Sequence, residues 1–259
     1  MITTLPKPLY TVDYKKYRKA NLYPVTLPDG TQLGPFKSVT KIKNIIDKPA
    51  LINWAKKMAL DCAKDEFYKF INEGIPLDAV SLEQIIESAK GAADRYKEKA
   101  ADIGTRTHDA IDEWINGKSP NLTDDIRPGF DNFQQWLKSG NITVIRGDTS
   151  IASILHGFGG RADFYFEQDS KLMLGDFKTG KRLYDDTVVQ IGGYDIATLE
   201  TYGIQVAGAI VLRIGKEIPG DIEPKEVNLT HAREAFMAAL NLFNKMDLKD
   251  KLWITKENK

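Results

Sequence analysis

The sequence predicts an α/β fold with a central mixed β-sheet flanked by helices and a mostly helical N-terminal part. Up to about residue 140, apolar residues recur at three- and four-residue intervals between capping and breaking residues, which is typical of helices. From Ile142 onward, short segments follow in the order strand, strand, strand, helix, strand, strand, helix. Val206–Ile214 is apolar on both faces, as expected for a central strand that is covered on both sides.

Composition limits the class of protein. The 259 residues suffice for one α/β unit with a real core. We expect residues 1–99 to form an N-terminal arm and helical subdomain packed on a core of residues 100–259. Lys and Arg balance Asp and Glu at 36 each, so binding of nucleic acid would need a locally positive groove. Cys62 is the only cysteine, which excludes an internal disulfide and a protein-held Fe–S cluster.

No apolar run approaches eighteen residues, and the N-terminus carries no signal-like apolar segment. We therefore expect a cytoplasmic protein without a membrane partner. The first 35 residues interleave aromatic and cationic side chains, as in Y-T-V-D-Y-K-K-Y-R-K. Such a segment is suited to stacking bases and holding phosphates, through Tyr10, Tyr14 or Tyr17 for example, and Trp54 further along is a similar candidate. A solvated arm packed on the domain is an equal alternative.

The helices are predicted from their caps and apolar stripes. Leu27–Thr31 is predicted to be a turn, with a connection between short strands as one option, and Ser38 to be the N-cap of a short helix. Asp47 is predicted to cap a helix that reaches about Asn72, and Ser81 to start the next. Two further helices are expected at about 100–116 and 125–138.

The strands are predicted at 142–155, 160–166 and 172–178, followed by a helix at about 185–202. The strand at 206–214 is followed by an edge strand at 222–229 containing Pro224. Thr230 is expected to cap a C-terminal helix to about Met246. Gly192 and Gly193 lie inside the helix at 185–202, where each costs about 1 kcal/mol relative to alanine. They therefore indicate a close neighbour, either the sheet or a nucleic-acid backbone.

The strands at 160–166 and 172–178 are separated by a tight turn, which predicts an antiparallel hairpin. The two-residue period places Arg161, Asp163 and Tyr165 on one face of the first strand. It places Asp176 and Lys178 on one face of the second. If Asp163 and Asp176 share a face, they form a small acidic cluster beside an ammonium, which is the pattern of a metal site with a catalytic lysine.

His108 falls on the buried stripe of its helix, three residues before Ile111. A lone histidine there is usually a core residue. Its dipeptide with Asp109 also matches HD phosphohydrolases, but those need an earlier histidine ligand and His108 is the first histidine in the chain. Gln190 and Tyr194 lie four residues apart, on one face of their helix.

The ordered set of these motifs resembles the PD-(D/E)XK nuclease superfamily, in its RecB-like branch of phage and bacterial DNA exonucleases. The set is G-x-x-x-H ending at His108, G-R-A-D ending at Asp163, D-F-K from Asp176 to Lys178, and Q-x-x-x-Y from Gln190 to Tyr194. The tripeptide D/E-x-K alone occurs six times, so the order of the four motifs carries the resemblance. The resemblance covers about residues 100–215 and implies a restriction-endonuclease-like core, here without the Fe–S cluster of some members.

The resemblance implies that Asp163, Asp176, His108 and the backbone carbonyl of Phe177 bind Mg²⁺ or Mn²⁺. Lys178 would assist the attacking water, and Gln190 and Tyr194 would orient the lysine or a DNA phosphate. Asp112 is a candidate to hold the second ring nitrogen of His108. The expected DNA contacts are Arg161, Thr179, Lys181, Arg182 and Tyr194, and Lys171 adds positive charge near the site.

Many relatives carry a glutamate before the G-x-x-D motif that serves a second metal. Here Asp148 is the only acid in the stretch 146–150, so a well-formed second metal site is not expected. The resemblance implies a DNA exonuclease acting on ends or single strands in phage or bacterial recombination, replication or repair, with a recombination or replication protein as a candidate partner. An endonuclease or resolvase of the same fold and an inactive DNA-binding module are the alternatives. The sequence leaves the oligomeric state open.

Overall fold

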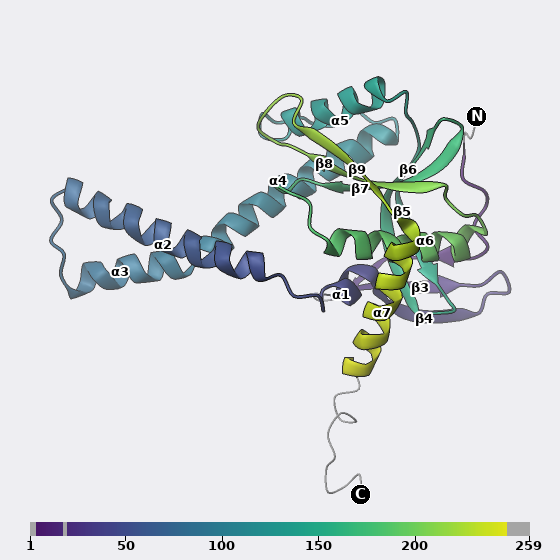
Figure 1. The fold of residues 1–259 in the computed structure, drawn as a ribbon, viewed down its shortest axis with the longest axis horizontal. Coiled ribbons are helices and arrows are strands. Elements are labelled where there is room, and N and C mark those ends of the chain that lie inside the picture. Colours follow the sequence, from purple (N-terminus) through teal and green to yellow (C-terminus); the bar gives the residue numbers. More distant parts are fainter. Residues whose placement is uncertain (1–3, 18–19, 248–259) are drawn as a thin grey trace, which may run out of the picture. The chain divides into compact units, whose positions relative to one another are not determined.

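The computed structural model describes residues 4–17 and 20–247 of the chain (Figure 1). The chain divides into two compact units, one formed by residues 1–46 and 106–259 and the other by residues 47–105. This division differs from the expected one at residue 99, because the N-terminal strands pair with the core sheet and belong to the first unit. Among the described residues, no helix is both long and apolar enough to cross a membrane.

The first unit is built on one nine-stranded mixed sheet, which confirms the predicted fold class. The order is β1-β3-β4-β6-β7-β8-β9, with β2 paired to β3 and β5 to β6. Strand β4 runs parallel to β6 and β7 parallel to β8, and the remaining pairs are antiparallel. The strands are β1 (Thr11–Val12), β2 (Lys15–Tyr17), β3 (Ala20–Thr26), β4 (Gln32–Ser38), β5 (Thr143–Ser153), β6 (Phe158–Gln168), β7 (Lys171–Lys178), β8 (Gly208–Ile214) and β9 (Ile222–Val227).

The helices of the first unit are α1, α5, α6 and α7, together with the C-terminal part of α4. The second unit contains α2, α3 and the beginning of α4. The helices are α1 (Val39–Lys43), α2 (Pro49–Asn72), α3 (Ala79–Lys90), α4 (Ala92–Ile115), α5 (Arg127–Ser139), α6 (Asp186–Tyr202) and α7 (Leu229–Asp247).

Four strands lie in residues 11–38, so the expectation that almost all of the first 140 residues are helical is wrong. Strand β3 alternates partly exposed residues with buried Tyr23 and Val25, the pattern of a strand with one face on a core. The predicted turn at Leu27–Thr31 connects β3 to β4, where the Thr31 amide donates to the side chain of Asp29 at 2.9 Å. The polar, proline-containing sequence hid this hairpin because its strands show little hydrophobic alternation.

Several helix caps differ from the prediction. Ser38 caps α1 as expected, accepting from the Lys41 amide at 3.0 Å. Asp47 does not cap α2, whose N-cap position is Lys48 without a side-chain hydrogen bond. Helix α3 starts earlier than predicted because Asp78 is its N-cap and Ser81 is the third residue of a capping box.

The last two helix boundaries also shift. Helix α4 begins at Ala92, directly after Gly91, and so starts earlier than the expected helix at about 100–116. At the start of α7, Asn228 accepts from the amide of His231 at 3.2 Å, so the capping residue is Asn228 and Thr230 lies inside the helix.

In the second unit, α2 and α3 run side by side in opposite directions (Figure 1). The Trp54 and Tyr96 rings lie 5.5 Å apart, and Cys62 lies 3.6 Å from the Ser88 hydroxyl. Helix α2 contains no buried residue. This unit is therefore held by partly exposed contacts rather than by a closed core.

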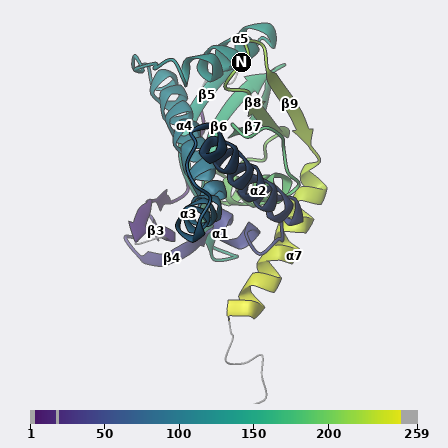
Figure 2. The ribbon, with the colours of Figure 1, turned by 90° about the vertical axis from the view of Figure 1, so that its left-hand side faces the viewer.

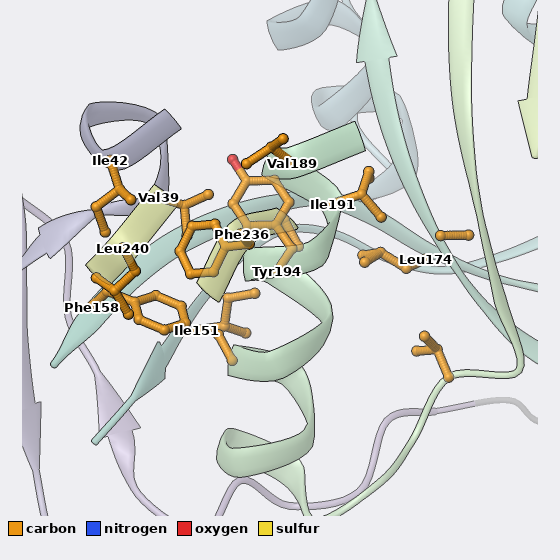
Figure 3. Close-up of a cluster of buried hydrophobic side chains, with 14 of the residues drawn as sticks. Val39, Ile42, Ile151, Phe158, Leu174, Val189, Ile191, Tyr194, Phe236 and Leu240 are labelled. Atoms are coloured by element: carbon orange, nitrogen blue, oxygen red, sulfur yellow. The ribbon is translucent and has the colours of Figure 1, made fainter. Parts of the chain in front are cut away.

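The two faces of the main sheet carry different cores. Helices α1, α6 and α7 cover a cluster of aliphatic and aromatic side chains that includes Val39, Ile151, Phe236 and Tyr194 (Figure 3). On the side of α5, the rings of Phe133 and Phe177 meet edge to face with centroids 5.2 Å apart. The remaining aromatic contacts on this side join Trp114, Phe130, Trp136, Phe164 and Phe166.

The two glycines of α6 face α7. A Cβ atom on Gly192 would lie 2.0 Å from the carbonyl oxygen of Ala232, and one on Gly193 would lie 2.7 Å from the Phe236 ring. The close neighbour that requires these two glycines is therefore neither the sheet nor a nucleic acid, the two options considered above. Close packing of α6 on α7 explains both residues.

We expect Gly192→Ala to destabilise the fold by about 2 kcal/mol, since the contact is with backbone and the gain in helix propensity is smaller than the overpacking cost. Urea unfolding measures this change. Gly180→Ala is the control, because its added methyl would meet its nearest neighbour, the Arg182 carbonyl, at an ordinary 3.5 Å. Equal stability of the two variants would contradict the packing described here.

Candidate active site

The β6–β7 hairpin brings the two predicted carboxylates together. The strands are antiparallel, with Phe164 opposite Gly175, so Asp163 and Asp176 occupy adjacent positions just beyond this pair. The Asp163 carboxylate accepts a hydrogen bond from the Phe177 amide at 2.7 Å. The side chain of Asp176 is fully buried, whereas that of Asp163 remains 21% exposed.

The faces of β6 alternate as predicted. Tyr165 points to α6, where its hydroxyl hydrogen-bonds the Thr198 hydroxyl at 2.6 Å. Phe164 and Phe166 point to the opposite face and contact the Trp136 ring of α5. By this alternation Asp163 faces α6, the same side as Asp176. The predicted acidic pair is therefore present on one face of the sheet.

Lys178 completes this arrangement. Its ammonium pairs with the Asp176 carboxylate and donates to the Phe177 carbonyl at 3.1 Å. Burial alone would lower the pKa of Lys178, but the Asp176 and Asp163 carboxylates outweigh it and raise this pKa. Burial and the Asp176 charge raise the pKa of Asp163. The site thus combines two crowded carboxylates with one ammonium.

Gln190 and Tyr194 of α6 support Asp176 from behind. The Gln190 amide donates to Asp176 Oδ1 at 3.2 Å and to the Tyr194 hydroxyl at 2.7 Å. The Tyr194 ring is 4% exposed and packs against the backbone of Gly160, where a Cβ atom would lie 2.6 Å from the ring. Burial raises the pKa of the Tyr194 hydroxyl well above its ordinary range. Gln190 therefore orients Asp176 rather than the lysine.

His108 joins the site from α4. Its Nδ1 atom lies 3.9 Å from Asp163 Oδ2, and its ring meets Phe177 edge to face at 5.5 Å. The side chain is one-third exposed. Partial burial, reinforced by the Lys178 ammonium, lowers the pKa of His108 to about 4. The imidazole is therefore neutral near pH 7 and has a nitrogen lone pair to offer.

The donor types fit a hard divalent cation. Carboxylates, a backbone carbonyl and a neutral imidazole are oxygen- and nitrogen-donor ligands of Mg²⁺ or Mn²⁺. No group of three His, Cys, Asp or Glu side chains within the described ranges is arranged to hold a metal. Asp176 instead pairs with Lys178, and Asp163 accepts from the Phe177 amide. Binding of a metal by Asp176 would therefore require Lys178 to give up its ion pair with this carboxylate.

Asp112 does not hold His108 as expected. Its Oδ1 atom is buried against Gly147, with no hydrogen-bond partner in the described part of the chain. Burial and the nearby Asp148 charge raise the pKa of Asp112. Asp148 itself forms a two-point ion pair with Arg161, including a 2.5 Å hydrogen bond from Arg161 Nε. Asp148 is therefore paired with Arg161, and the expectation about a second metal site stays a prediction.

The predicted DNA contacts differ in accessibility. Arg161 is 40% exposed but paired with Asp148, and its guanidinium lies 4.8 Å from the Tyr14 ring centroid. Lys181 and Arg182 are exposed in the loop after β7, where Thr179 is partly exposed. Tyr194 is buried behind Asp176 and Gly160, so a direct contact between it and a phosphate does not fit the structure.

The sequence reasoning missed an ion pair beside the site. Lys43 of α1 donates to Asp186, at the start of α6, at 2.6 Å, and both side chains are at least 90% buried. The Asp186 charge also raises the pKa of Lys178. A signal existed for Lys43, which lies four residues after buried Val39 and so on the inner stripe of its helix. Its partner, 143 residues away, left no local signal.

We expect Lys43→Ala to destabilise the protein by about 3 kcal/mol, because Asp186 would remain buried without this cation. Thermal or urea unfolding measures the loss. Lys41→Ala is the control, since Lys41 is exposed on the same helix and should change stability by less than about 0.5 kcal/mol. Combining Lys43→Met with Asp186→Asn should cost less than the sum of the single changes. Additive losses would show that the two side chains are not coupled.

Comparisons with known proteins find only weak structural similarities. No protein-family model and no curated protein matches the chain. Solved structures that share part of the fold include an alkaline exonuclease, LHK-Exo from Laribacter hongkongensis, with 13% identity and a TM-score of 0.30 over 60% of this chain and 90% of that one. The same enzyme in complex with dAMP gives 13% identity and a TM-score of 0.29 over 59% and 90%.

A third structure, described as SSO0001, has 16% identity and a TM-score of 0.24 over 42% of this chain, and the match spans only 55% of that protein's length. Identities and TM-scores this low establish no family. The function is therefore inferred from this chain's own residues.

Proposed function

We propose that this chain is a metal-dependent DNA nuclease that hydrolyses phosphodiester bonds. The observation that carries the proposal is the convergence of His108, Asp163, Asp176 and Lys178 at one point of the sheet, with Gln190 holding Asp176. These residues come from α4, β6, β7 and α6 and span more than 80 positions of the sequence. Two crowded carboxylates beside an ammonium and a neutral imidazole are costly for stability, which favours a functional reason for them.

When bound, Mg²⁺ or Mn²⁺ would neutralise charge on the scissile phosphate and lower the pKa of a water molecule. Asp163, Asp176, the Phe177 carbonyl and His108 are the residues that would hold it. Lys178 would stabilise the negative charge that develops on the phosphate, through its ammonium N–H groups. Gln190 would keep the Asp176 carboxylate in one orientation, with Tyr194 fixing the Gln190 amide in turn.

Within this proposal, exonuclease action on DNA ends or single strands, in phage or bacterial recombination, replication or repair, is the form we favour. This preference comes from the resemblance of the motifs to RecB-like exonucleases. It would place the protein in the bacterial cytoplasm, with DNA as its partner and a recombination or replication protein as a candidate second partner. An endonuclease of the same fold and an inactive DNA-binding module are the competing functions.

Digestion of end-labelled linear DNA and of circular DNA, single- and double-stranded, separates these functions. With Mg²⁺ or Mn²⁺, we expect loss of linear but not circular substrate, and no cleavage in EDTA. Cutting of circles would instead identify an endonuclease. Binding of DNA without cleavage in any metal would leave the binding module as the function and overturn the proposal.

A further inference from the structure

The positive charge of this neutral chain is concentrated at its N-terminal end. Residues 1–46 contain eight Lys or Arg and two Asp, a net charge of +6, so residues 47–259 carry a net charge of −6. A phosphate backbone is attracted by such a local excess even when the whole chain has no net charge. All 46 residues belong to the unit that contains the candidate active site.

Strand β2 exposes this charge together with an aromatic ring. Lys15, Lys16 and Tyr17 are all exposed, and 61% of the Tyr17 surface is accessible. Tyr14, just before the strand, is 37% exposed. Aromatic rings beside lysines are one arrangement by which proteins bind single-stranded nucleic acid.

A groove continues this surface between the β2–β3 hairpin and α1. It has a volume of about 460 Å³ and is lined by Tyr17 and Asn21 on one side and by Ser38, Lys41 and Asn44 on the other. The Tyr17 ring can stack on a base, and the Lys41 ammonium can pair with a phosphate. The amide and hydroxyl groups can hydrogen-bond base edges or the sugar. In the described ranges, no carboxylate forms an ion pair with Lys15, Lys16 or Lys41.

Helix α1 connects the groove to the surroundings of the candidate active site. Lys41 and Asn44 of the α1 segment line the groove, whereas Lys43 of the same helix pairs with Asp186 at the start of α6. Strands β3 and β4 and helix α1 appear together at one end of the sheet in both ribbon views (Figures 1 and 2). The hairpin also reaches the site strand directly, since the Tyr14 ring covers Arg161, two residues before Asp163.

We propose that the exposed strand β2, with Lys15 and Lys16, and the adjoining groove lined by Tyr17, Asn21, Lys41 and Asn44 bind a single strand of DNA outside the catalytic centre. The proposal rests on the nuclease function and adds to it a place where the strand is held. Lys15 and Lys16 on strand β2 and Lys41 in the groove contact phosphates, and Tyr17 stacks on a base. Stacking and phosphate contacts depend little on base identity, so the site is expected to accept unpaired strands of many sequences.

Binding is measured by fluorescence anisotropy with a labelled oligothymidine of about 20 nucleotides, in EDTA, over a range of salt concentrations. Each phosphate contact on a single strand contributes about 0.7 to the slope of log affinity against log salt. For the full chain with Lys15, Lys16 and Lys41 changed to Gln, the magnitude of this slope should therefore be smaller by about 2 than for the wild type. The control carries the same charge change at three exposed lysines elsewhere, Lys118→Gln, Lys225→Gln and Lys245→Gln.

The stacking role is tested at one ring. Tyr17→Ala should weaken binding by about fivefold or more, and Tyr17→Phe should leave it nearly unchanged, as expected for base stacking. Polyglutamate should compete far less well than oligothymidine at equal charge. Equal competition, or equal effects of the Ala and Phe variants, would show that the groove responds to charge alone and overturn the proposed base contact. Preferred binding to vesicles of phosphatidylserine and phosphatidylcholine would overturn a nucleic-acid partner.

The measurement separates this proposal from the nuclease proposal, because binding in EDTA needs no cleavage. An unchanged salt slope in the triple variant, with its fold confirmed by thermal unfolding, would overturn the groove while leaving cleavage by the wild type intact. Loss of binding in the variant together with an uncleaved substrate in every metal would support the groove and overturn the nuclease.

Discussion

Asp163→Asn is expected to reduce metal-dependent DNA cleavage by about 10²–10³-fold while leaving the protein at least as stable as the wild type. The asparagine keeps the shape of the side chain and can still accept the Phe177 amide, which lies 2.7 Å from Asp163 Oδ2. It removes the negative charge that a divalent cation would need. A loss of activity without a loss of stability is the signature of a residue kept for chemistry.

The stability part of this expectation follows from the charges around Asp163. Burial and the Asp176 carboxylate raise the pKa of Asp163, which means that its ionised form is unfavourable in the folded state. A neutral amide does not carry that penalty, so the free energy of unfolding near pH 7 should stay equal or rise. A clear fall in the unfolding temperature would contradict the arrangement of the two carboxylates.

The matched control for this variant is Asp169→Asn, in the turn that joins β6 to β7. Asp169 has a φ of 51°, a conformation that asparagine adopts well, so the change is conservative. Cleavage rates under saturating Mn²⁺ should match the wild type. A similar loss in both variants would mean that the hairpin tolerates no change and that Asp163 has no special role.

Gln190→Leu should lower the cleavage rate by about 10- to 100-fold, because the Asp176 carboxylate would lose the amide that orients it. Tyr194→Phe should have a smaller effect, since Gln190 still reaches Asp176 at 3.2 Å without the tyrosine hydroxyl. Both residues are buried, so affinity for DNA should remain unchanged. Single-turnover rates and anisotropy titrations together separate an effect on rate from an effect on binding.

Tyr165→Phe is the control for this pair of variants. Tyr165 is also buried and also hydrogen-bonds a residue of α6, the Thr198 hydroxyl, but neither belongs to the site. The variant should lose about 1 kcal/mol of stability and no activity. If Tyr165→Phe slowed cleavage as much as Gln190→Leu, the effect would come from a loosened α6 rather than from the orientation of Asp176.

Much of the candidate site could be predicted because its geometry is local. A two-residue period places Asp176 and Lys178 on one face of β7, and a four-residue spacing places Gln190 beside Tyr194 in α6. The hairpin turn then fixes which strand positions meet. Such relations hold in any strand or helix and need no knowledge of the tertiary structure.

The parts that sequence could not give depend on long-range packing. Lys43 and Asp186 meet only because α1 packs on α6, and the parallel pairing of β4 with β6 joins segments that are 120 residues apart. The N-terminal strands lack a clear hydrophobic alternation, because most of their side chains stay partly exposed. The predicted contact between Asp112 and His108 is wrong for the same reason. Helical spacing suggested this contact but does not show that the Asp112 carboxylate lies against Gly147.

The most direct test of the nuclease function is a titration of Mn²⁺ into the wild type and into Asp163→Asn, with end-labelled single-stranded DNA as substrate. Cleavage should be absent in EDTA, rise to saturation with Mn²⁺ in the wild type, and remain at least about 10²-fold slower in the variant. Cleavage that persists in EDTA, or that is equal in the two proteins, would contradict a metal-dependent nuclease built on Asp163.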